Sequence, residues 1–139
     1  MVDAKAMIER SIDRWNERDR GGWLALFDPE PFEFEGPGGV RVAGPQAVEL
    51  VWSTWIDAFP DNKVGLVGAH GEQDIATHQG VFEGTHTGPL VGPAGTVEAT
   101  GRSVTLPFVM IYRTNGESIT GMRLYFDQME LLTQLGVIG

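Results

Sequence analysis

The stretch that decides the fold is residues 103–126, SVTLPFVMIYRTNGESITGMRLYF. It holds two runs rich in β-branched, aromatic and aliphatic residues, at positions 103–113 and 117–126. Thr114-Asn115-Gly116 separates them, and an Asn-Gly pair between two such runs is a strong β-hairpin signal because both residues tolerate positive φ. The stretch therefore predicts two antiparallel strands.

The residues before this hairpin extend the same pattern. Residues 63–69 and 75–86 also favour strands, with a turn predicted at 71–74. Residues 87–101 contain several glycines and two prolines, too many for a regular element. The chain from Lys63 onwards is therefore predicted to be an antiparallel meander.

The N-terminal half favours helices. Asp3 is placed to cap a helix that runs to about residue 19, and a short second helix is predicted around Trp23, before the break at Asp28-Pro29. A third helix opens at Pro45 and ends at Pro60, with one apolar stripe made of Val48, Val51, Trp52, Trp55, Ile56 and Phe59.

Three short elements complete the predicted fold. Short strands are expected at residues 32–35 and 40–42, and a last helix at about residues 128–135. The fold class is therefore α+β, with a curved antiparallel sheet covered on one face by the N-terminal helices. The concavity between helices and sheet suits an apolar ligand.

Length and charge limit the classes of function. The chain has 139 residues, which predicts one domain over residues 1–139, and its net charge of −9 disfavours binding to nucleic acid or an anionic membrane. It has no cysteine, so thiolate chemistry and disulfides are excluded. The first ten residues carry charge throughout, unlike a signal peptide, so we expect a cytoplasmic protein.

No motif in the sequence calls for a cofactor. There is no glycine-rich phosphate loop, no GxSxG elbow and no histidine pair at helical i, i+4 spacing. We therefore expect neither a metal nor a cofactor. Any catalysis would depend on carboxylate, histidine, arginine and tyrosine side chains in a mostly apolar pocket.

The last strand carries the first candidate site residues. Strand alternation places Arg123, Tyr125 and Asp127 on one face and the apolar residues between them on the other. We expect the polar set to line the cavity, where burial would raise the pKa of a carboxyl towards neutrality. Asp127 has a second interpretation, because Glu130 follows at the spacing of a capping box and Asp127 would then cap the last helix.

Other candidates lie on the neighbouring elements. His78 and His86 share a strand face and can be either structural or part of the site. Trp52 and Trp55 belong to the helical stripe, where either can form the floor of a pocket. Phe108 belongs to an apolar set of its strand that can fill the cavity.

Several short motifs occur along the chain in a fixed order: AFPD at 58–61, GTHTG at 84–88, ATGRSV at 99–104, YR and NG within 112–116, YFDQ at 125–128 and LLTQLG at 131–136. In this order they closely resemble the SnoaL-like polyketide cyclase family, from the first helix to Gly136. The resemblance implies the nuclear transport factor 2-like fold, a cone of curved antiparallel sheet closed by helices. It also implies cofactor-independent intramolecular aldol ring closure of an aromatic polyketide intermediate, with Asp127 as the catalytic aspartate.

The sequence departs from the family at one point. Cyclases of this family use a histidine near the aspartate, expected on the penultimate strand, but residues 104–113 contain none. His86 or His78 would have to substitute for it. The predicted catalytic residues are thus Asp127, His86 and Arg123, and a small apolar or aromatic polyketide-like ligand is predicted to contact Trp52, Trp55, His78, Phe108 and Tyr125.

Other functions remain open on the same scaffold. The chain can be an isomerase or an epoxide hydrolase of the same fold, or a protein that binds a small molecule without turnover. An epoxide hydrolase would need a second carboxylate, which the sequence does not locate. We expect a homodimer formed through the outer sheet face, because residues 103–113 are apolar on both strand faces.

Overall fold

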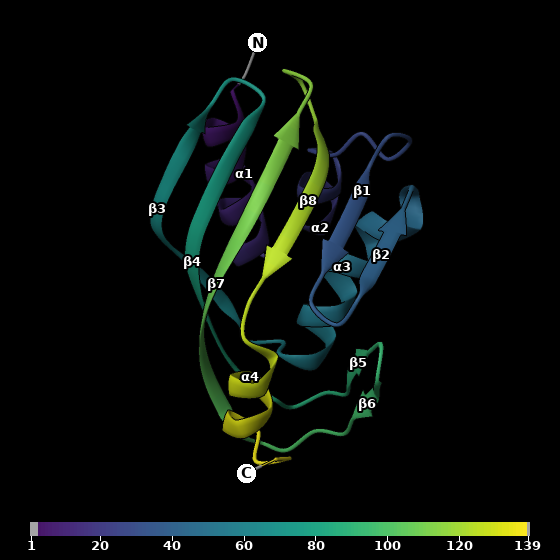
Figure 1. Ribbon diagram of the computed structural model, residues 1–139, viewed down its shortest axis with the longest axis vertical. Helices are drawn as coiled ribbons and strands as arrows, with labels where there is room; N and C mark the ends of the chain where they lie inside the picture. Colours follow the sequence, from purple (N-terminus) through teal and green to yellow (C-terminus); the bar gives the residue numbers. More distant parts are fainter. Residues whose placement is uncertain (1–2, 139) are drawn as a thin grey trace.

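The computed structural model describes residues 3–138. The chain forms, in order, α1 (Ala4–Asn16), α2 (Arg20–Leu24), β1 (Glu33–Gly36), β2 (Val40–Ala43), α3 (Pro45–Ala58), β3 (Lys63–Glu72), β4 (Ile75–Thr85), β5 (Leu90–Gly92), β6 (Gly95–Val97), β7 (Ser103–Thr114), β8 (Ile119–Tyr125) and α4 (Gln128–Gln134) (Figure 1). The predicted α+β class, with a curved sheet and helices, is confirmed.

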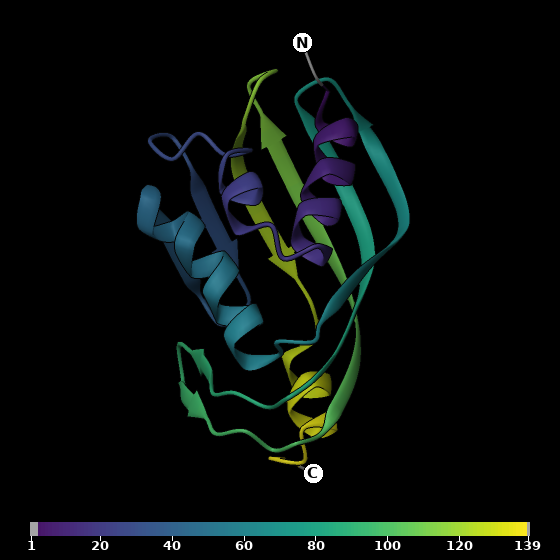
Figure 2. The same ribbon diagram turned by 180° about the vertical axis from the view of Figure 1, so that it is seen from behind.

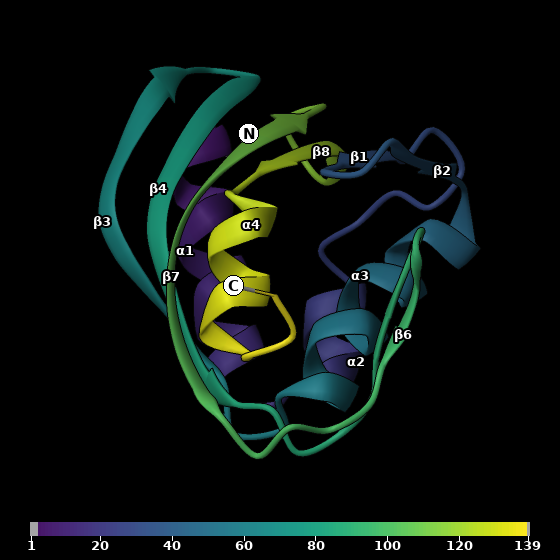
Figure 3. The ribbon, with the colours of Figure 1, turned by 60° about the horizontal axis from the view of Figure 1, so that its bottom comes forward.

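The main sheet has the strand order β2-β1-β8-β7-β4-β3. The meander from β3 through β4 and β7 to β8 is antiparallel throughout, as the sequence predicts. β1 lies parallel to β8, a pairing between segments far apart in the chain that local patterns do not reveal. The sheet bends around the helices, so that its concave face forms the inside of a cone (Figure 3).

The three N-terminal helices lie on this concave face (Figure 2). α1 begins where Asp3 accepts a hydrogen bond from the Ala6 amide at 3.0 Å, as predicted. It ends at Asn16, earlier than predicted, because Arg18 takes a left-handed φ of 59° and reverses the chain. Asp19 then caps α2 through the Gly22 amide.

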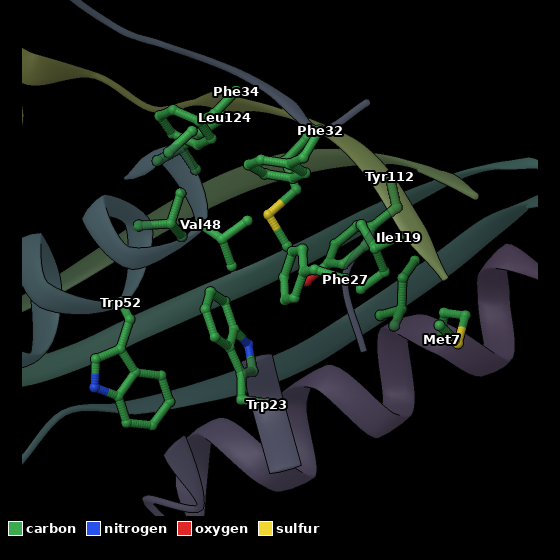
Figure 4. Packing of buried hydrophobic residues seen from close by; sticks show 14 of the residues in the cluster. Met7, Trp23, Phe27, Phe32, Phe34, Val48, Trp52, Tyr112, Ile119 and Leu124 are labelled. Carbon is green, nitrogen blue, oxygen red and sulfur yellow. The ribbon is translucent and has the colours of Figure 1, made fainter. Parts of the chain in front are cut away.

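The core between helices and sheet is rich in aromatic side chains (Figure 4). Trp23 lies at its centre, with ring centroids 4.4 Å from Phe27, 5.3 Å from Trp52 and 5.5 Å from Trp15. Trp52 is thus a core residue. Buried aromatic rings contribute large apolar areas to the stability of the fold.

Residues 87–101 were predicted to lack regular structure, and this prediction is wrong. They form an arm whose end is a two-stranded hairpin, β5 and β6, with Leu90 opposite Val97 and Gly92 opposite Gly95. Gly95 adopts a φ of 125° at the turn, which a glycine permits. The glycines and prolines thus shape a tight hairpin. The arm lies at the same end of the molecule as α4 (Figures 1 and 2).

Candidate functional site

A cavity of about 70 Å³, here called the inner chamber, lies between the helices and the concave sheet face. Strand alternation decides which side chains reach it: His78 and Phe82 from β4, Phe108, Met110 and Tyr112 from β7, and Met122 and Leu124 from β8. Ser11, Trp15 and Trp23 face it from α1 and α2. The chamber is therefore mainly apolar. Its polar groups include the His78 imidazole and the Ser11 and Tyr112 hydroxyls.

His78 and Tyr112 are the two described residues with titratable side chains that line the chamber. The His78 side chain is almost fully buried, and burial lowers the pKa of the imidazole below its ordinary value, so the ring is neutral at neutral pH. Nε2 lies 3.2 Å from the Gly65 carbonyl oxygen. Because a carbonyl only accepts, Nε2 carries the proton. Nδ1 therefore holds the lone pair of the ring, and it is buried without a partner in the described structure.

Gly80 makes room for this arrangement. It follows His78 on the inward face of β4, and a Cβ atom there would lie 2.6 Å from His78 Nε2 and 2.7 Å from the Gly65 oxygen. It would also lie 2.7 Å from the Phe108 ring. Phe108 packs edge-on against His78, with ring centroids 5.0 Å apart. The imidazole is thus fixed from three sides.

Ser11 and Tyr112 supply hydroxyl groups to the same chamber. The Trp23 indole donates to Ser11 Oγ at 3.2 Å, and Ser11 Oγ lies 3.1 Å from the Tyr112 hydroxyl. These three groups have three donor protons, and the two bonds among them use two. One hydroxyl proton is left to offer to a ligand. Burial raises the pKa of Tyr112 to about 12, so the phenol stays protonated.

The prediction that Arg123, Tyr125 and Asp127 line the cavity is wrong. Arg123 lies on the outer face of the sheet, with Nε 3.5 Å from a Glu35 carboxylate oxygen, and Tyr125 is 51% exposed. The helix layer covers only the concave face, and the apolar residues at 122, 124 and 126 occupy it. Alternation then turns the polar set outward.

Asp127 acts as a helix cap. Its Oδ1 accepts a hydrogen bond from the Glu130 amide at 3.1 Å at the start of α4, and the residue is exposed. Of the two interpretations drawn from the sequence, the structure therefore shows the N-cap.

His86 does not line the chamber. The Thr100 amide donates to its Nδ1 at 3.2 Å, and the Gly101 amide donates to its carbonyl oxygen at 2.8 Å. Its ring packs on Phe59 with centroids 5.2 Å apart. These contacts hold the base of the arm formed by residues 87–101. The prediction that His86 is a catalytic residue is therefore wrong, and its role is structural.

A second cavity, here called the outer cleft, adjoins the inner chamber. Its volume is about 570 Å³, and α3, the turn between β1 and β2, the β5–β6 hairpin and α4 surround it. The two cavities share four wall residues: Val51, Trp55, Leu124 and Phe126. Trp55 was predicted to be a ligand contact and lines both, whereas Trp52 lines neither.

Two functional groups escaped the sequence-based prediction. Ser11 lies on the buried face of α1 with Met7, Ile8 and Trp15. A hydroxyl side chain within that apolar helical stripe could have indicated a polar group facing the cavity. Tyr112 lies on the same face of β7 as Phe108, and this alternation could have placed it in the cavity as well.

The described residues contain no group of three or more His, Asp or Glu side chains arranged to hold a metal ion. Within residues 3–138, no helix has both the length and the apolar character needed to cross a membrane.

Comparison with solved structures defines the class of this fold. A proposed SnoaL-like polyketide cyclase from Jannaschia sp. CCS1 superimposes with a TM-score of 0.84, at 20% identity over 99% of this chain and 96% of that chain. AclR from Streptomyces galilaeus, a proposed hydroxylase, gives a TM-score of 0.78 at 22% identity over 96% and 81% of the two chains.

A protein from Catenulispora acidiphila with a ketosteroid isomerase-like fold, solved with trimethylamine, gives a TM-score of 0.74 at 18% identity over 94% and 92% of the two chains. The architecture is thus that of the nuclear transport factor 2-like and ketosteroid isomerase-like proteins.

The sequence model of the SnoaL-like polyketide cyclases matches residues 5–135, so the chain belongs to that family. No curated protein sequence matches it.

Proposed function

We propose that the protein binds a neutral, mainly apolar carbonyl compound in the cone and closes a ring within it by cofactor-independent aldol addition. In this proposal His78 takes the place of Asp127 as the base. The supporting observation is the pairing, in one apolar chamber, of an unpartnered imidazole lone pair with a spare hydroxyl proton. A carbonyl compound with an acidic C–H bond needs this combination of acceptor and donor.

The proposed reaction uses only these groups. His78 Nδ1 removes a proton from the carbon between two carbonyl groups, and the enolate oxygen accepts the spare hydroxyl proton of the Ser11–Tyr112 pair as a hydrogen bond. The enolate carbon attacks a third carbonyl, elsewhere in the same molecule, and forms one C–C bond while the C=O π bond becomes an alkoxide. The alkoxide produced takes the proton back from the imidazolium, so the product is an isomer of the substrate.

The environment of His78 restricts the substrate class. A lowered pKa makes the imidazole a weaker base than a free one, which limits it to relatively acidic C–H bonds. Methylene groups flanked by two carbonyls, as in β-polyketones, meet this requirement. This match supports a polyketide-like substrate.

The other candidate functions differ in what they need. Isomerisation of a double bond would use the same base and donor. Epoxide hydrolysis would need a carboxylate, and among the described residues that line the two cavities none is Asp or Glu. Binding without turnover would use the chamber without proton transfer, and the experiment below separates it from catalysis.

The test is exchange of the acidic C–H of a 2-substituted 1,3-diketone in D₂O, followed by proton NMR. His78→Gln keeps an amide donor for the Gly65 carbonyl but removes the base, and we expect the acceleration over buffer to fall by about 100-fold or more. Asp127→Asn is the matched control and should stay within about twofold of the wild type. Unchanged exchange in His78→Gln, or loss in Asp127→Asn, contradicts the proposal. No acceleration by the wild type indicates a binding protein.

The cellular location and the state of association predicted from the sequence belong to this proposal as well. We propose a cytoplasmic homodimer formed through the outer sheet face. Half-buried Val109 lies there beside exposed Tyr125 on β8, and half-buried Ile111 and Val81 lie on the same face. On this face Gln79 is paired with Val109 and Arg123 with Ile111. Partly exposed apolar side chains grouped on one sheet face support an interface.

A further inference from the structure

The inner chamber is too small for the substrate that the proposed function requires. Its volume is about 70 Å³, whereas sites for drug-sized ligands measure roughly 300–1,000 Å³. The chamber holds the acceptor and the donor but leaves no space for an extended carbon skeleton. The remainder of the ligand must lie elsewhere.

The outer cleft has the missing volume in the required place. At about 570 Å³ it falls within the range of small-molecule sites. It adjoins the chamber across Val51, Trp55, Leu124 and Phe126, so a ligand that passes these four side chains occupies both spaces. Trp55 is half-buried and meets Phe126 and Phe82 edge-on, each with ring centroids 5.5 Å away.

The chemistry of the outer cleft selects its occupant. Among the described residues that line it, none carries a charge, and Thr54 and Gln128 are the polar side chains. A charged group placed there would lose its hydration without gaining a partner. The net charge of −9 also disfavours an anion.

The rim of the outer cleft is built from three separate elements that meet at Gly38. This residue has a φ of 83°, and a Cβ atom there would lie 2.9 Å from the Gln128 side-chain nitrogen and 3.0 Å from Pro93 Cγ. The β1–β2 turn, α4 and the β5–β6 hairpin therefore approach one another closely. Leu50 and Val91 line the cleft while remaining exposed, which gives its opening an apolar surface.

We propose that the outer cleft binds the uncharged apolar body of the substrate while a single carbonyl-bearing end reaches the inner chamber past Trp55. In this proposal the outer cleft binds the substrate through its apolar walls, and the inner chamber carries out the proton transfer. This inference rests on the proposed function for the identity of the carbonyl end. It specifies a long, neutral, amphiphilic ketone or polyketone.

The test is binding of the neutral 2-alkanones from 2-hexanone to 2-decanone, measured by isothermal titration calorimetry. The carbonyl-bearing end is constant in this series and only the apolar body grows. For the wild type we expect the dissociation constant to fall about three- to fourfold for each added methylene, on the order of a hundredfold over the series.

Two variants on α3 locate the apolar body. Thr54→Trp fills the outer cleft from its wall without touching the inner chamber, and should abolish the gain in affinity with chain length. Ser53→Trp adds the same bulk at the adjacent position, which lines neither cavity, and should bind like the wild type. Chain-length dependence that is absent in the wild type or that persists in Thr54→Trp overturns the inference.

This outcome is separable from that of the proposed chemistry. If His78→Gln exchanges the diketone proton as fast as the wild type, the assignment of the base fails. The alkanone series can still show the expected loss in Thr54→Trp, in which case the outer cleft stands as a ligand compartment. Conversely, the gain in affinity with chain length can persist in Thr54→Trp while His78→Gln loses exchange. In that case the outer cleft is not a ligand compartment, and His78 remains the assigned base.

Discussion

The buried state of His78 makes the stability of the protein depend on pH. The pKa of His78 in the folded protein lies below its ordinary value of 6.5 because burial disfavours the imidazolium. His86 is also fully buried, and burial lowers its pKa in the same direction. As the pH falls below about 6.5, the unfolded chain therefore takes up protons at both positions that the folded protein does not.

The sign and size of the effect follow from this difference in bound protons. The free energy of unfolding must decrease as the pH falls from about 6.5 towards the folded-state pKa values. Each histidine contributes at most about 1.4 kcal/mol for each pH unit, so the two together contribute up to about 2.8 kcal/mol for each pH unit.

The assay is urea denaturation, followed by tryptophan fluorescence, at intervals between pH 7.5 and 5.0. His78→Gln should reduce the slope of unfolding free energy against pH by up to half, because one of the two buried imidazoles is gone. His70→Gln is the matched control at an exposed position and should leave the slope unchanged. A wild-type slope in His78→Gln would mean that the imidazole is solvated or already charged in the folded protein, and the assignment of Nδ1 as a lone pair would be wrong.

Three further predictions concern other parts of the molecule. Asp127→Ala should lower the free energy of unfolding by about 1 kcal/mol and Asp127→Asn by a few tenths, since only the alanine variant loses the cap. Diketone exchange should be unchanged in both variants. Loss of exchange would restore a catalytic role for Asp127. The double variant Ser11→Ala/Tyr112→Phe should slow exchange about tenfold, because it removes both hydroxyl donors, whereas either single variant still leaves one spare hydroxyl proton. Exchange at the wild-type rate in the double variant would exclude these hydroxyls from the proposed step. Sedimentation should find the wild type at twice the mass of one chain. Val109→Asp should sediment at the mass of one chain, because burying a carboxylate in the interface is unfavourable. A monomeric wild type would refute the dimer.

Local patterns were sufficient for most elements of the fold. The Asn115-Gly116 turn between two apolar runs predicted β7 and β8, and Asp3 and Pro45 marked the starts of α1 and α3. These signals depend on nearest neighbours, such as a cap bonded three residues away or a turn that permits positive φ. The hairpin of residues 87–101 was missed because its three-residue strands are too short to show a periodic pattern.

The candidate site could be predicted only in part. His78, Trp55 and Phe108 were identified and do line the inner chamber, whereas Trp52 packs in the core. The family motif drew attention to Asp127, which caps a helix outside the cavity. Ser11 was missed, since its hydroxyl meets Tyr112 across 101 positions of the chain.

The amino-acid sequence by itself determined that β8 has two chemically different faces, one apolar and one carrying Arg123 and Tyr125. Alternation along a strand is a local property of the backbone and needs no partner. Only the tertiary structure decided which face meets the helices, because that depends on where α1, α2 and α3 pack after a long stretch of intervening chain. The apolar face of β8 turned inward since its burial stabilises the fold, and the base of the proposed reaction therefore came from β4 rather than from the end of β8.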